Sequence, residues 1–166
     1  MDILDGLKKR RSVRVFAKKA VPRETLEQIV DCARFAPTAR NEQPWEFVVL
    51  TDPARIKKLA ELTDYGRFIA NAPACVAVLC ADTKYYLEDG SAATMNLQMA
   101  AMAFGIGSCW VAGDKKSYSG QINEFLGVPA QYKLVSLVPL GFPDNASIFR
   151  EIDKRPLAEL LHWEKY

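Results

Sequence analysis

Three arginines and a serine lie close together near the start of the chain, at Arg10, Arg11, Ser12 and Arg14. The guanidinium group presents a planar fork of donors that matches phosphate oxygens, and each charge-assisted hydrogen bond is worth about 1.5 to 3 kcal/mol. The cluster therefore predicts a phosphate site. A solvated helix end, where cations are favoured at the negative pole, is the competing interpretation. Apolar residues alternate with the basic ones up to Phe16, which favours an extended segment over a solvated helix end.

A second polar segment, residues 37–45, is rich in side chains that form hydrogen bonds. Asn41 and Gln43 each carry an amide that both donates and accepts, so they can bind the edge of a heteroaromatic ring, and Thr38 adds a hydroxyl. An ordinary turn before a strand, with Trp45 as a core residue, explains this segment equally well.

The composition is that of an ordinary globular protein, with 166 residues of which 49% are hydrophobic and 25% charged. A formal net charge of +2 gives no global positive field, so we expect no nucleic-acid partner. No apolar run reaches the roughly 18 residues that cross a membrane, and acidic residues in the first turns do not fit a signal peptide. We therefore expect a cytoplasmic protein with no membrane partner.

The cysteines and the histidine further limit the kinds of catalytic or metal site that we expect. The four cysteines contain no CxxC pair, and Cys75, Cys80 and Cys109 lie in apolar runs, so we expect reduced core thiols and neither a disulfide framework nor a metal site. The single histidine, His162, lies near the end of the chain, which gives little support to a histidine base.

Helices and strands alternate irregularly along the chain, which indicates an α+β fold. The apolar run over residues 74–79 is short enough for a strand buried on both faces in the middle of a sheet. The pattern predicts helices over residues 1–9, 22–35, 52–62, 91–104 and 122–126, strands over 46–50, 74–79, 109–111 and 132–140, and a turn at 64–68.

The expected helix over residues 91–104 is apolar on most of its circumference, so we expect it to be buried on several sides or to lie at a subunit interface. Asn96 in its middle is expected to fix a neighbouring loop. Gly105 and Gly107 form a GxG after this helix and before a strand. A Rossmann phosphate loop has the reverse order, so we exclude a dinucleotide fingerprint there.

A second basic pair, Lys154 and Arg155, precedes a short amphipathic piece with Leu157, Leu160 and Trp163. By itself such a pair is typical of a solvated turn. Placed beside the arginine cluster in space, it would complete the same phosphate site.

Together these segments resemble the nitroreductase family of flavoproteins over essentially the whole chain. The matching segments are residues 10–14, 37–45, the alanine-rich helix with Asn96, 105–110, 138–141 and 154–157, followed by His162 and Trp163. The resemblance implies a single domain over residues 1–166 and an α+β fold with a central, mainly antiparallel sheet flanked by helices. It also implies an interlocked homodimer with two FMN sites at the subunit interface.

The resemblance also implies how FMN is held. Because the flavin carries the chemistry, no side chain is expected to be catalytic. The two basic segments would hold the phosphate and ribityl end, a loop of the partner subunit would lie along the ring, and a backbone N–H of Ala112 or Gly113 would face N5. The implied cofactor-binding residues are Arg10, Arg11, Ser12, Arg14, Pro37, Thr38, Ala39, Asn41, Arg67, Trp110, Val111, Ala112, Gly113, Lys154 and Arg155.

The implied reaction is a hydride transfer from NADH or NADPH through flavin N5 to an electron-poor acceptor such as a nitroaromatic or quinone, with ping-pong kinetics. The short connection between Cys80 and Ser91 lacks the helical insertions that cover the active site in larger members, so we expect an open acceptor pocket. Three alternatives remain: a flavin enzyme of another type (a reductive dehalogenase, an enone reductase or a flavin-fragmenting enzyme), a non-catalytic FMN-binding module, and an interaction domain for acidic partners.

Overall fold

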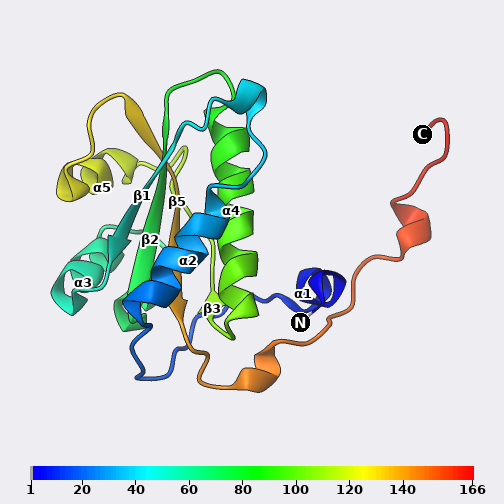
Figure 1. Ribbon diagram of the computed structural model, residues 1–166, viewed down its shortest axis with the longest axis horizontal. Helices are drawn as coiled ribbons and strands as arrows, with labels where there is room; N and C mark the ends of the chain where they lie inside the picture. The colour runs from blue at the N-terminus through cyan, green and yellow to red at the C-terminus, as the bar shows by residue number, and fades with distance from the viewer. Residues whose placement is uncertain (1) are drawn as a thin grey trace.

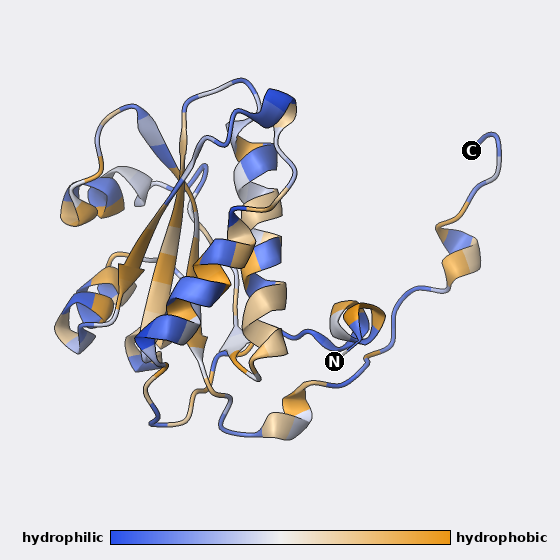
Figure 2. Ribbon diagram, in the orientation of Figure 1, coloured by the Kyte–Doolittle hydropathy of each residue, from blue (hydrophilic) through white to orange (hydrophobic). Residues whose placement is uncertain are grey.

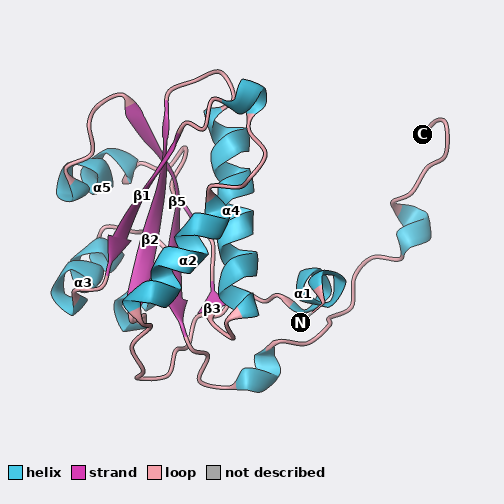
Figure 3. Cartoon of the chain, viewed as in Figure 1, coloured by secondary structure: helices cyan, strands magenta, loops and turns pink. Residues whose placement is uncertain are grey.

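The computed structural model describes residues 2–166. Its centre is a five-stranded sheet in the order β1-β2-β5-β3, with β4 also paired to β5 (Figure 1). All of these strand pairs are antiparallel, and helices lie on both faces of the sheet (Figure 3), so the predicted α+β fold is confirmed. The strands are β1 (Trp45–Leu50), β2 (Ala74–Ala81), β3 (Gly107–Ser108), β4 (Val111–Ala112) and β5 (Tyr132–Gly141). The helices are α1 (Ile3–Lys9), α2 (Arg23–Ala33), α3 (Pro53–Glu61), α4 (Tyr86–Ala103) and α5 (Ser119–Leu126), with 3-10 turns η1 (Ala39–Asn41), η2 (Arg67–Asn71), η3 (Ala146–Ile148) and η4 (Leu157–Glu159).

Strand β2 shows how the sequence builds two helical layers. Val76 and Val78 belong to a core cluster with α2 and α4, whereas Cys75 and Ala77 belong to a cluster with α3 and α5. Alternate side chains of a strand point to opposite faces, so only a continuous apolar run can fill both cores. Residues 74–80 are all buried and β2 lies between β1 and β5, which confirms the predicted mid-sheet strand.

Helix α4 begins at Tyr86, whereas the sequence pattern predicted a start at residue 91. Gly90 lies near the N-terminal end of this helix, where a glycine costs about 0.5 to 1 kcal/mol relative to alanine. In the structure it allows close packing, because a Cβ there would lie 2.6 Å from Val135 Cγ2 and 2.9 Å from Cys80 Sγ. The connection from β2 is therefore limited to residues 82–85, even shorter than expected.

The strand expected over residues 109–111 is two short strands, β3 and β4, which pair with β5 in one continuous register. Continuing that register places Pro139 of β5 opposite Cys109, between the two short strands. Proline has no N–H to donate to the ladder, so the pairing is interrupted there.

The other helices begin and end close to the predicted positions. Asp52 caps α3, because its Oδ1 accepts a hydrogen bond of 2.9 Å from the N–H of Arg55. Gly127 ends α5 in the left-handed conformation with φ of 70°, which glycine adopts without steric cost. Trp45 is only 8% exposed, so it is a core residue, as the ordinary-turn interpretation of residues 37–45 expected.

Two predictions about single side chains need correction. Asn96 is half-buried, and its Nδ2 lies 3.4 Å from the carbonyl oxygen of Cys32, so it links α4 to α2 and does not fix a loop. Cys32 itself is exposed, whereas Cys75, Cys80 and Cys109 are buried free thiols as expected. Burial raises the pKa of Cys75 to about 12.

Residues 150–166 are all exposed, and this tail runs away from the sheet (Figure 1). It nevertheless contains hydrophobic residues, coloured orange in Figure 2. The side chains of Leu157 and Trp163 are exposed by 70% and 77%. Within residues 2–166, no helix has both the length and the apolar character needed to cross a membrane.

Candidate functional site

The arginine segment is anchored from its buried side. Val13 is 0% exposed, and its N–H donates to the carbonyl oxygen of Ser108 at 2.9 Å. The neighbouring Gly107 lies so close that a Cβ there would be 2.6 Å from Val13 Cγ2. Successive side chains of an extended segment point to opposite sides, so Ser12 and Arg14 face outward when Val13 faces inward.

The outward side chains meet the chain after η3 in a hollow of about 440 Å³. This second segment contributes alternate residues, as one face of an extended chain does. The structure thus brings Lys154 to the arginine cluster within a single chain. The hollow is lined by Arg10, Arg11, Ser12, Arg14, Ile148, Arg150, Ile152 and Lys154.

Arg155 does not line this hollow. Its Nε lies 3.5 Å from Glu159 Oε2, within the tail. The sequence reasoning chose the adjacent pair Lys154 and Arg155 and missed Arg150, although the period of two in an extended segment connects residue 150 with residue 154 and separates both from residue 155.

Arg11 has a different role from its neighbours. Its guanidinium donates to the carbonyl oxygen of Lys8 at 2.6 Å and also to that of Arg10, at the C-terminal end of α1. A cation there satisfies free helix carbonyls, which is the helix-end role that the sequence left open. The Nε atom of Arg11 is buried and has no hydrogen-bond partner among residues 2–166, so one strong donor at this site is unused.

The segment Trp110–Gly113 contains the two backbone N–H groups, those of Ala112 and Gly113, that the resemblance places near the flavin ring. The N–H of Gly113 donates to the carbonyl oxygen of Val135 at 3.0 Å, so it is already used. Hydrogen-bonded pairs alternate along an antiparallel ladder, so the N–H and C=O of Ala112 point away from β5. The carbonyl of Ala112 accepts a hydrogen bond from the hydroxyl of Tyr118, and Ala112 itself is exposed. Of the two N–H groups that the sequence proposed, only that of Ala112 is directed away from the sheet.

This segment begins beside the arginine cluster. Burial raises the pKa of the Cys109 thiol, whereas the charge of Arg14, a hydrogen bond with Ser12 and the charge of Arg10 oppose that rise. Ser12 of the basic hollow also forms a β-bridge with Ser108, so Trp110 lies two residues beyond a residue that contacts the hollow. Trp110 is 37% exposed, which leaves an aromatic surface open next to it.

Arg67 lies at the start of η2 and is exposed. The next residue, Phe68, has its ring 5.7 Å from the guanidinium carbon of Arg14. Phe68 also packs in the small cluster around Val13 and Phe16. Turn η2 therefore lies next to the arginine segment, and Arg67, at the start of this turn, lies in the same region.

The loop with the remaining predicted residues is held by a carboxylate that the sequence reasoning missed. Asp89 is only 4% exposed; its Oδ2 accepts from Thr38 Oγ1 at 2.8 Å and its Oδ1 from the N–H of Ala39 at 3.2 Å. Thr38 Oγ1 also accepts from the N–H of Gln43 at 3.1 Å. Nothing local in residues 37–45 pointed to a partner 50 residues away in the chain.

The same loop contains three non-glycine residues in the left-handed region. Arg40, Asn41 and Gln43 have φ of 55°, 58° and 49°. Such conformations cost free energy and persist where surrounding contacts enforce them, frequently at binding sites. Pro37 and Asn41 are exposed at the two ends of this stretch, so the loop presents polar backbone and side chains outward.

The loop and the basic hollow lie at opposite ends of α4 (Figure 1). An α-helix rises about 1.5 Å per residue, so the 18 residues of α4 span about 27 Å. A single chain therefore contains two separated parts of the predicted site: the basic hollow with Trp110–Gly113, and the loop of residues 37–43.

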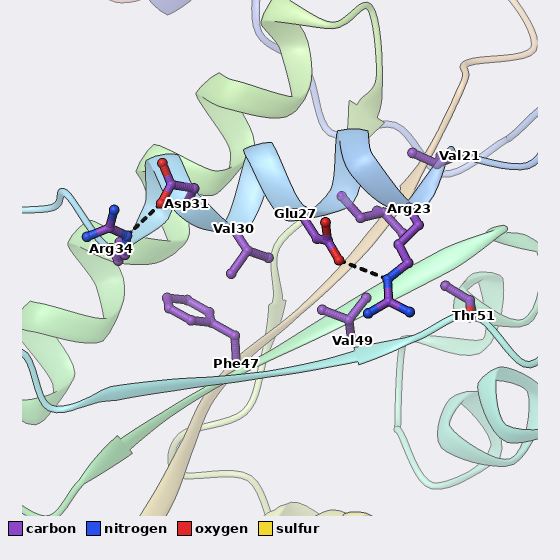
Figure 4. Close-up of a pocket in the computed structure, with 10 residues that line it drawn as sticks. Val21, Arg23, Glu27, Val30, Asp31, Arg34, Phe47, Val49 and Thr51 are labelled. Atoms are coloured by element: carbon purple, nitrogen blue, oxygen red, sulfur yellow. Dashed lines mark hydrogen bonds and ion pairs between the residues drawn. The ribbon is translucent and has the colours of Figure 1, made fainter.

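A larger groove, of about 720 Å³, lies between α2 and β1 and contains none of the predicted site residues (Figure 4). Its floor is apolar, and its rim carries the ion pairs of Arg23 with Glu27 and Arg34 with Asp31, at 2.8 Å and 2.6 Å. Paired, solvated charges around an apolar floor provide no chemistry of their own. The candidate site is therefore the smaller, basic hollow.

The donor set of the basic hollow fits a phosphate ester. It combines cationic forks, a serine hydroxyl and an unused buried Nε, and it continues into a segment with an exposed tryptophan and a free backbone N–H. A ligand with an anionic tail and a flat aromatic head matches this order of groups, as FMN does.

The chain is similar in sequence to known proteins over most of its length. The model described as the nitroreductase family matches residues 7–83 and 65–142. A candidate NADH dehydrogenase/NAD(P)H nitroreductase of Archaeoglobus fulgidus is 37% identical over 165 residues, which covers 95% of this chain and 94% of the relative. Human iodotyrosine deiodinase 1 is 26% identical over 191 aligned residues, which covers 93% of this chain and 66% of the deiodinase.

Solved structures of similar proteins have the same fold as this chain. A candidate NADH oxidase of Clostridium acetobutylicum superposes with a TM-score of 0.91 at 30% identity, covering 99% of this chain and 100% of that one. An FMN-dependent nitroreductase of Clostridium difficile gives 0.85 at 27% identity, covering 98% and 99%. A candidate nitroreductase of Desulfovibrio desulfuricans, solved in complex with FMN, gives 0.82 at 27% identity, covering 100% and 98%. From the family match and these similarities over nearly the whole chain, the protein belongs to the nitroreductase family.

Proposed function

We propose that this protein is an FMN-dependent oxidoreductase that takes electrons from NADH or NADPH and reduces an electron-poor acceptor such as a nitroaromatic or quinone. When bound, FMN supplies the redox chemistry, because it accepts a hydride and passes the electrons on. The observation that carries the proposal is the basic hollow of one protomer, which leads directly to an open backbone N–H at Ala112. The described residues 2–166 would act as one domain.

In this proposal Arg10, Ser12, Arg14, Arg150 and Lys154 hold the phosphate. Arg150 replaces Arg155 in the set that the sequence indicated, because Arg150 lines the hollow and Arg155 pairs with Glu159. Several cationic donors are needed because a phosphate monoester carries up to two negative charges. Arg11 would contribute its Nε while its terminal nitrogens hold α1 in place.

At the other end of the ligand, the N–H of Ala112 would donate a hydrogen bond to the reacting edge of the ring, and Arg67 would bring a positive charge to the pyrimidine side. A fixed donor and a nearby cation stabilise negative charge that develops during electron transfer. Tyr118 and the ladder to β5 hold the Ala112 backbone, so this donor needs no reorganisation. No side-chain acid or base is required in this scheme.

The protein would act as a homodimer with two sites at the interface. The loop of Pro37, Thr38, Ala39 and Asn41 lies at the far end of α4 from the basic hollow of its own chain. In a two-fold dimer every contact between the subunits occurs twice, so the loop of each subunit can complete the site of the other and two equivalent sites result.

Exposed apolar surface supports the dimer. Helix α1 leaves Ile3, Leu4 and Leu7 exposed by 71%, 62% and 52%, and the tail leaves Leu157 and Trp163 exposed. Burial of apolar surface is favourable by about 25 cal/mol per Å², so these residues gain free energy when a second subunit covers them.

An absorption spectrum of the purified protein under nitrogen, before and after NADH or NADPH, tests the proposal. We expect yellow protein that bleaches with the donor and recovers its colour when a nitroaromatic or quinone is added, with parallel lines in steady-state kinetics. Yellow protein that no donor bleaches would favour a non-catalytic flavin-binding module. Colourless protein whose melting temperature ignores added FMN would favour an interaction domain, because a tightly bound ligand raises the melting temperature.

A second candidate reaction is reductive removal of a halogen from an aromatic ring, which the similarity to human iodotyrosine deiodinase 1 favours. That alignment spans 191 positions and is longer than this chain, so the deiodinase has segments without a counterpart here. Only residues 82–85 connect β2 to α4, which leaves no lid in this connection. Iodide release from iodotyrosine, measured beside nitroaromatic reduction with the same donor, distinguishes the two; we expect nitroaromatic reduction to be faster.

A further inference from the structure

The first turn of α4 holds the outward loop of residues 37–43 through one side chain. Asp89 accepts two hydrogen bonds from that loop, one from the Thr38 hydroxyl and one from the Ala39 N–H. Both donors lie in the stretch for which the proposed function assigns a contact with the cofactor of the partner subunit. The loop is polar and exposed elsewhere, so this buried carboxylate is its main attachment to the core in the described residues.

The position of Asp89 is itself fixed. Gly90 packs so tightly that an added Cβ would lie 2.6 Å from Val135 Cγ2. In the next turn, Thr94 Oγ1 lies 2.7 Å from the Gly90 carbonyl oxygen and 2.8 Å from Ser136 Oγ. The first turn of α4 is therefore held against β5, and the carboxylate has little freedom to move.

A carboxylate is well suited to hold a strained loop. Arg40, Asn41 and Gln43 are in the left-handed region, which costs each of them free energy. Hydrogen bonds to a buried charge are stronger than those between neutral groups, so Asp89 can offset that cost. Without it, the backbone of residues 38–43 would relax to other conformations.

We infer that Asp89 is a positioning residue for the FMN site of the partner subunit: it holds the loop of its own chain in the shape that the partner's cofactor requires. The inference rests on the proposed function, and it adds a residue that the sequence did not indicate. Asp89 does not touch the cofactor, so its effect on binding is transmitted through Thr38 and Ala39.

The first test is FMN affinity in the full-length holoenzyme. Asp89→Ala removes both hydrogen bonds and is expected to weaken FMN binding by about 10- to 100-fold. Asp89→Asn keeps the shape and at least one acceptor, so its loss should be smaller. Asp31→Asn is the matched control, because Asp31 is an exposed aspartate paired only with Arg34. A change of less than about threefold for Asp89→Ala, in protein that folds and dimerises, would overturn the inference.

The decisive test uses mixed dimers, made from two differently tagged chains. Arg14→Ala weakens the phosphate grip of its own chain, which is the set of cationic residues lining the basic hollow, so each mixed dimer has one intact grip. With Arg14→Ala and Asp89→Ala on opposite chains, the intact grip faces an intact loop, and one site per dimer should bind FMN with wild-type affinity. With both changes on one chain, the intact grip faces the altered loop, and no site should bind with wild-type affinity.

The other outcomes are equally informative. If the arrangement with both changes on one chain retained the wild-type site, Asp89 would act within its own subunit and the inference would be wrong. If the two arrangements bound FMN equally, Asp89 would act only on overall folding, and the inference would also be wrong. If Asp89→Ala does not fold, Asp89→Asn in the same two arrangements gives the same contrast. Wild-type protein that binds no FMN would contradict the proposed function itself.

Discussion

The two ends of α4 hold their segments by different means. At the C-terminal end, the arginine segment is anchored by the buried Val13, by a backbone hydrogen bond from Val13 to Ser108 and by close packing on Gly107. At the N-terminal end, the carboxylate of Asp89 holds the outward loop. Apolar and backbone anchoring is shared among several contacts, whereas the loop depends on one buried carboxyl side chain. The two ends should therefore respond to different substitutions.

The largest effect is expected at the apolar anchor. Val13→Asp places a charge without a partner at a fully buried position, which should lower the free energy of unfolding by about 3 kcal/mol or more. Urea denaturation followed by circular dichroism measures the loss. Val15→Asp is the matched control, because Val15 is 66% exposed in the same segment. Equal losses for the two variants would contradict the assignment of Val13 as the anchor.

The next largest effect is expected on the affinity for FMN and not on the stability of the fold. Arg14→Ala should weaken FMN binding by about 1.5 to 3 kcal/mol, because one charge-assisted donor set is removed from the hollow. Arg155→Ala serves as the comparison, since Arg155 pairs with Glu159 outside the hollow and should change FMN binding little. Isothermal titration of the apoprotein gives both values. If Arg155→Ala weakened FMN binding more than Arg14→Ala, Arg155 would belong to the phosphate-binding residues, and its replacement by Arg150 in the proposed set would be wrong.

Tyr86 gives a smaller, pH-dependent effect at the N-terminal end of α4. A hydrogen bond of 2.7 Å to Asp114 Oδ1, together with burial, raises the pKa of Tyr86 to about 12. A raised pKa in the folded state means that the stabilisation is present below the ordinary tyrosine pKa of about 10 and is lost as the pH rises from about 10 to 12. The difference in unfolding free energy between wild type and Tyr86→Phe should therefore shrink across that range. A difference that is constant with pH would show that the hydrogen bond to Asp114 does not form.

The sequence predicted most of the fold because its strongest signals are local and periodic. The apolar run of β2, the cap at Asp52 and the glycine after α5 each specify a boundary through nearby residues. The errors have long-range causes: Gly90 packs on Val135, and Pro139 lies opposite Cys109 in another strand. Neither contact can be deduced from the local pattern.

The residues of the candidate site also fall into two groups, those with a local sequence signal and those whose partners are distant in the sequence. The arginine cluster could be recognised from the sequence because its residues are adjacent and its chemistry is distinctive. Lys154, which the sequence also indicated, lines the same hollow. Arg150 was missed because the sequence reasoning grouped the neighbouring residues Lys154 and Arg155. In an extended segment, alternate residues such as 150 and 154 share a face instead. Asp89 was missed because its partners lie far away in the sequence, at Thr38 and Ala39. The tertiary structure alone brings these groups together.

The smallest predicted effect sharpens the contrast between the two ends of α4. Gln98 is 3% exposed, and its Nε2 lies 3.4 Å from Ser108 Oγ, which is long for a hydrogen bond. Gln98→Met keeps a similar length and removes this weak contact, so the loss of unfolding free energy should stay below about 1 kcal/mol and FMN binding should be unchanged. Chemical denaturation and FMN titration, run beside Asp89→Asn, measure both quantities. If Gln98→Met weakened FMN binding as much as Asp89→Asn, the arginine segment would depend on a single polar side chain after all, and the distinction between a shared apolar anchor and a single ionic one would fail.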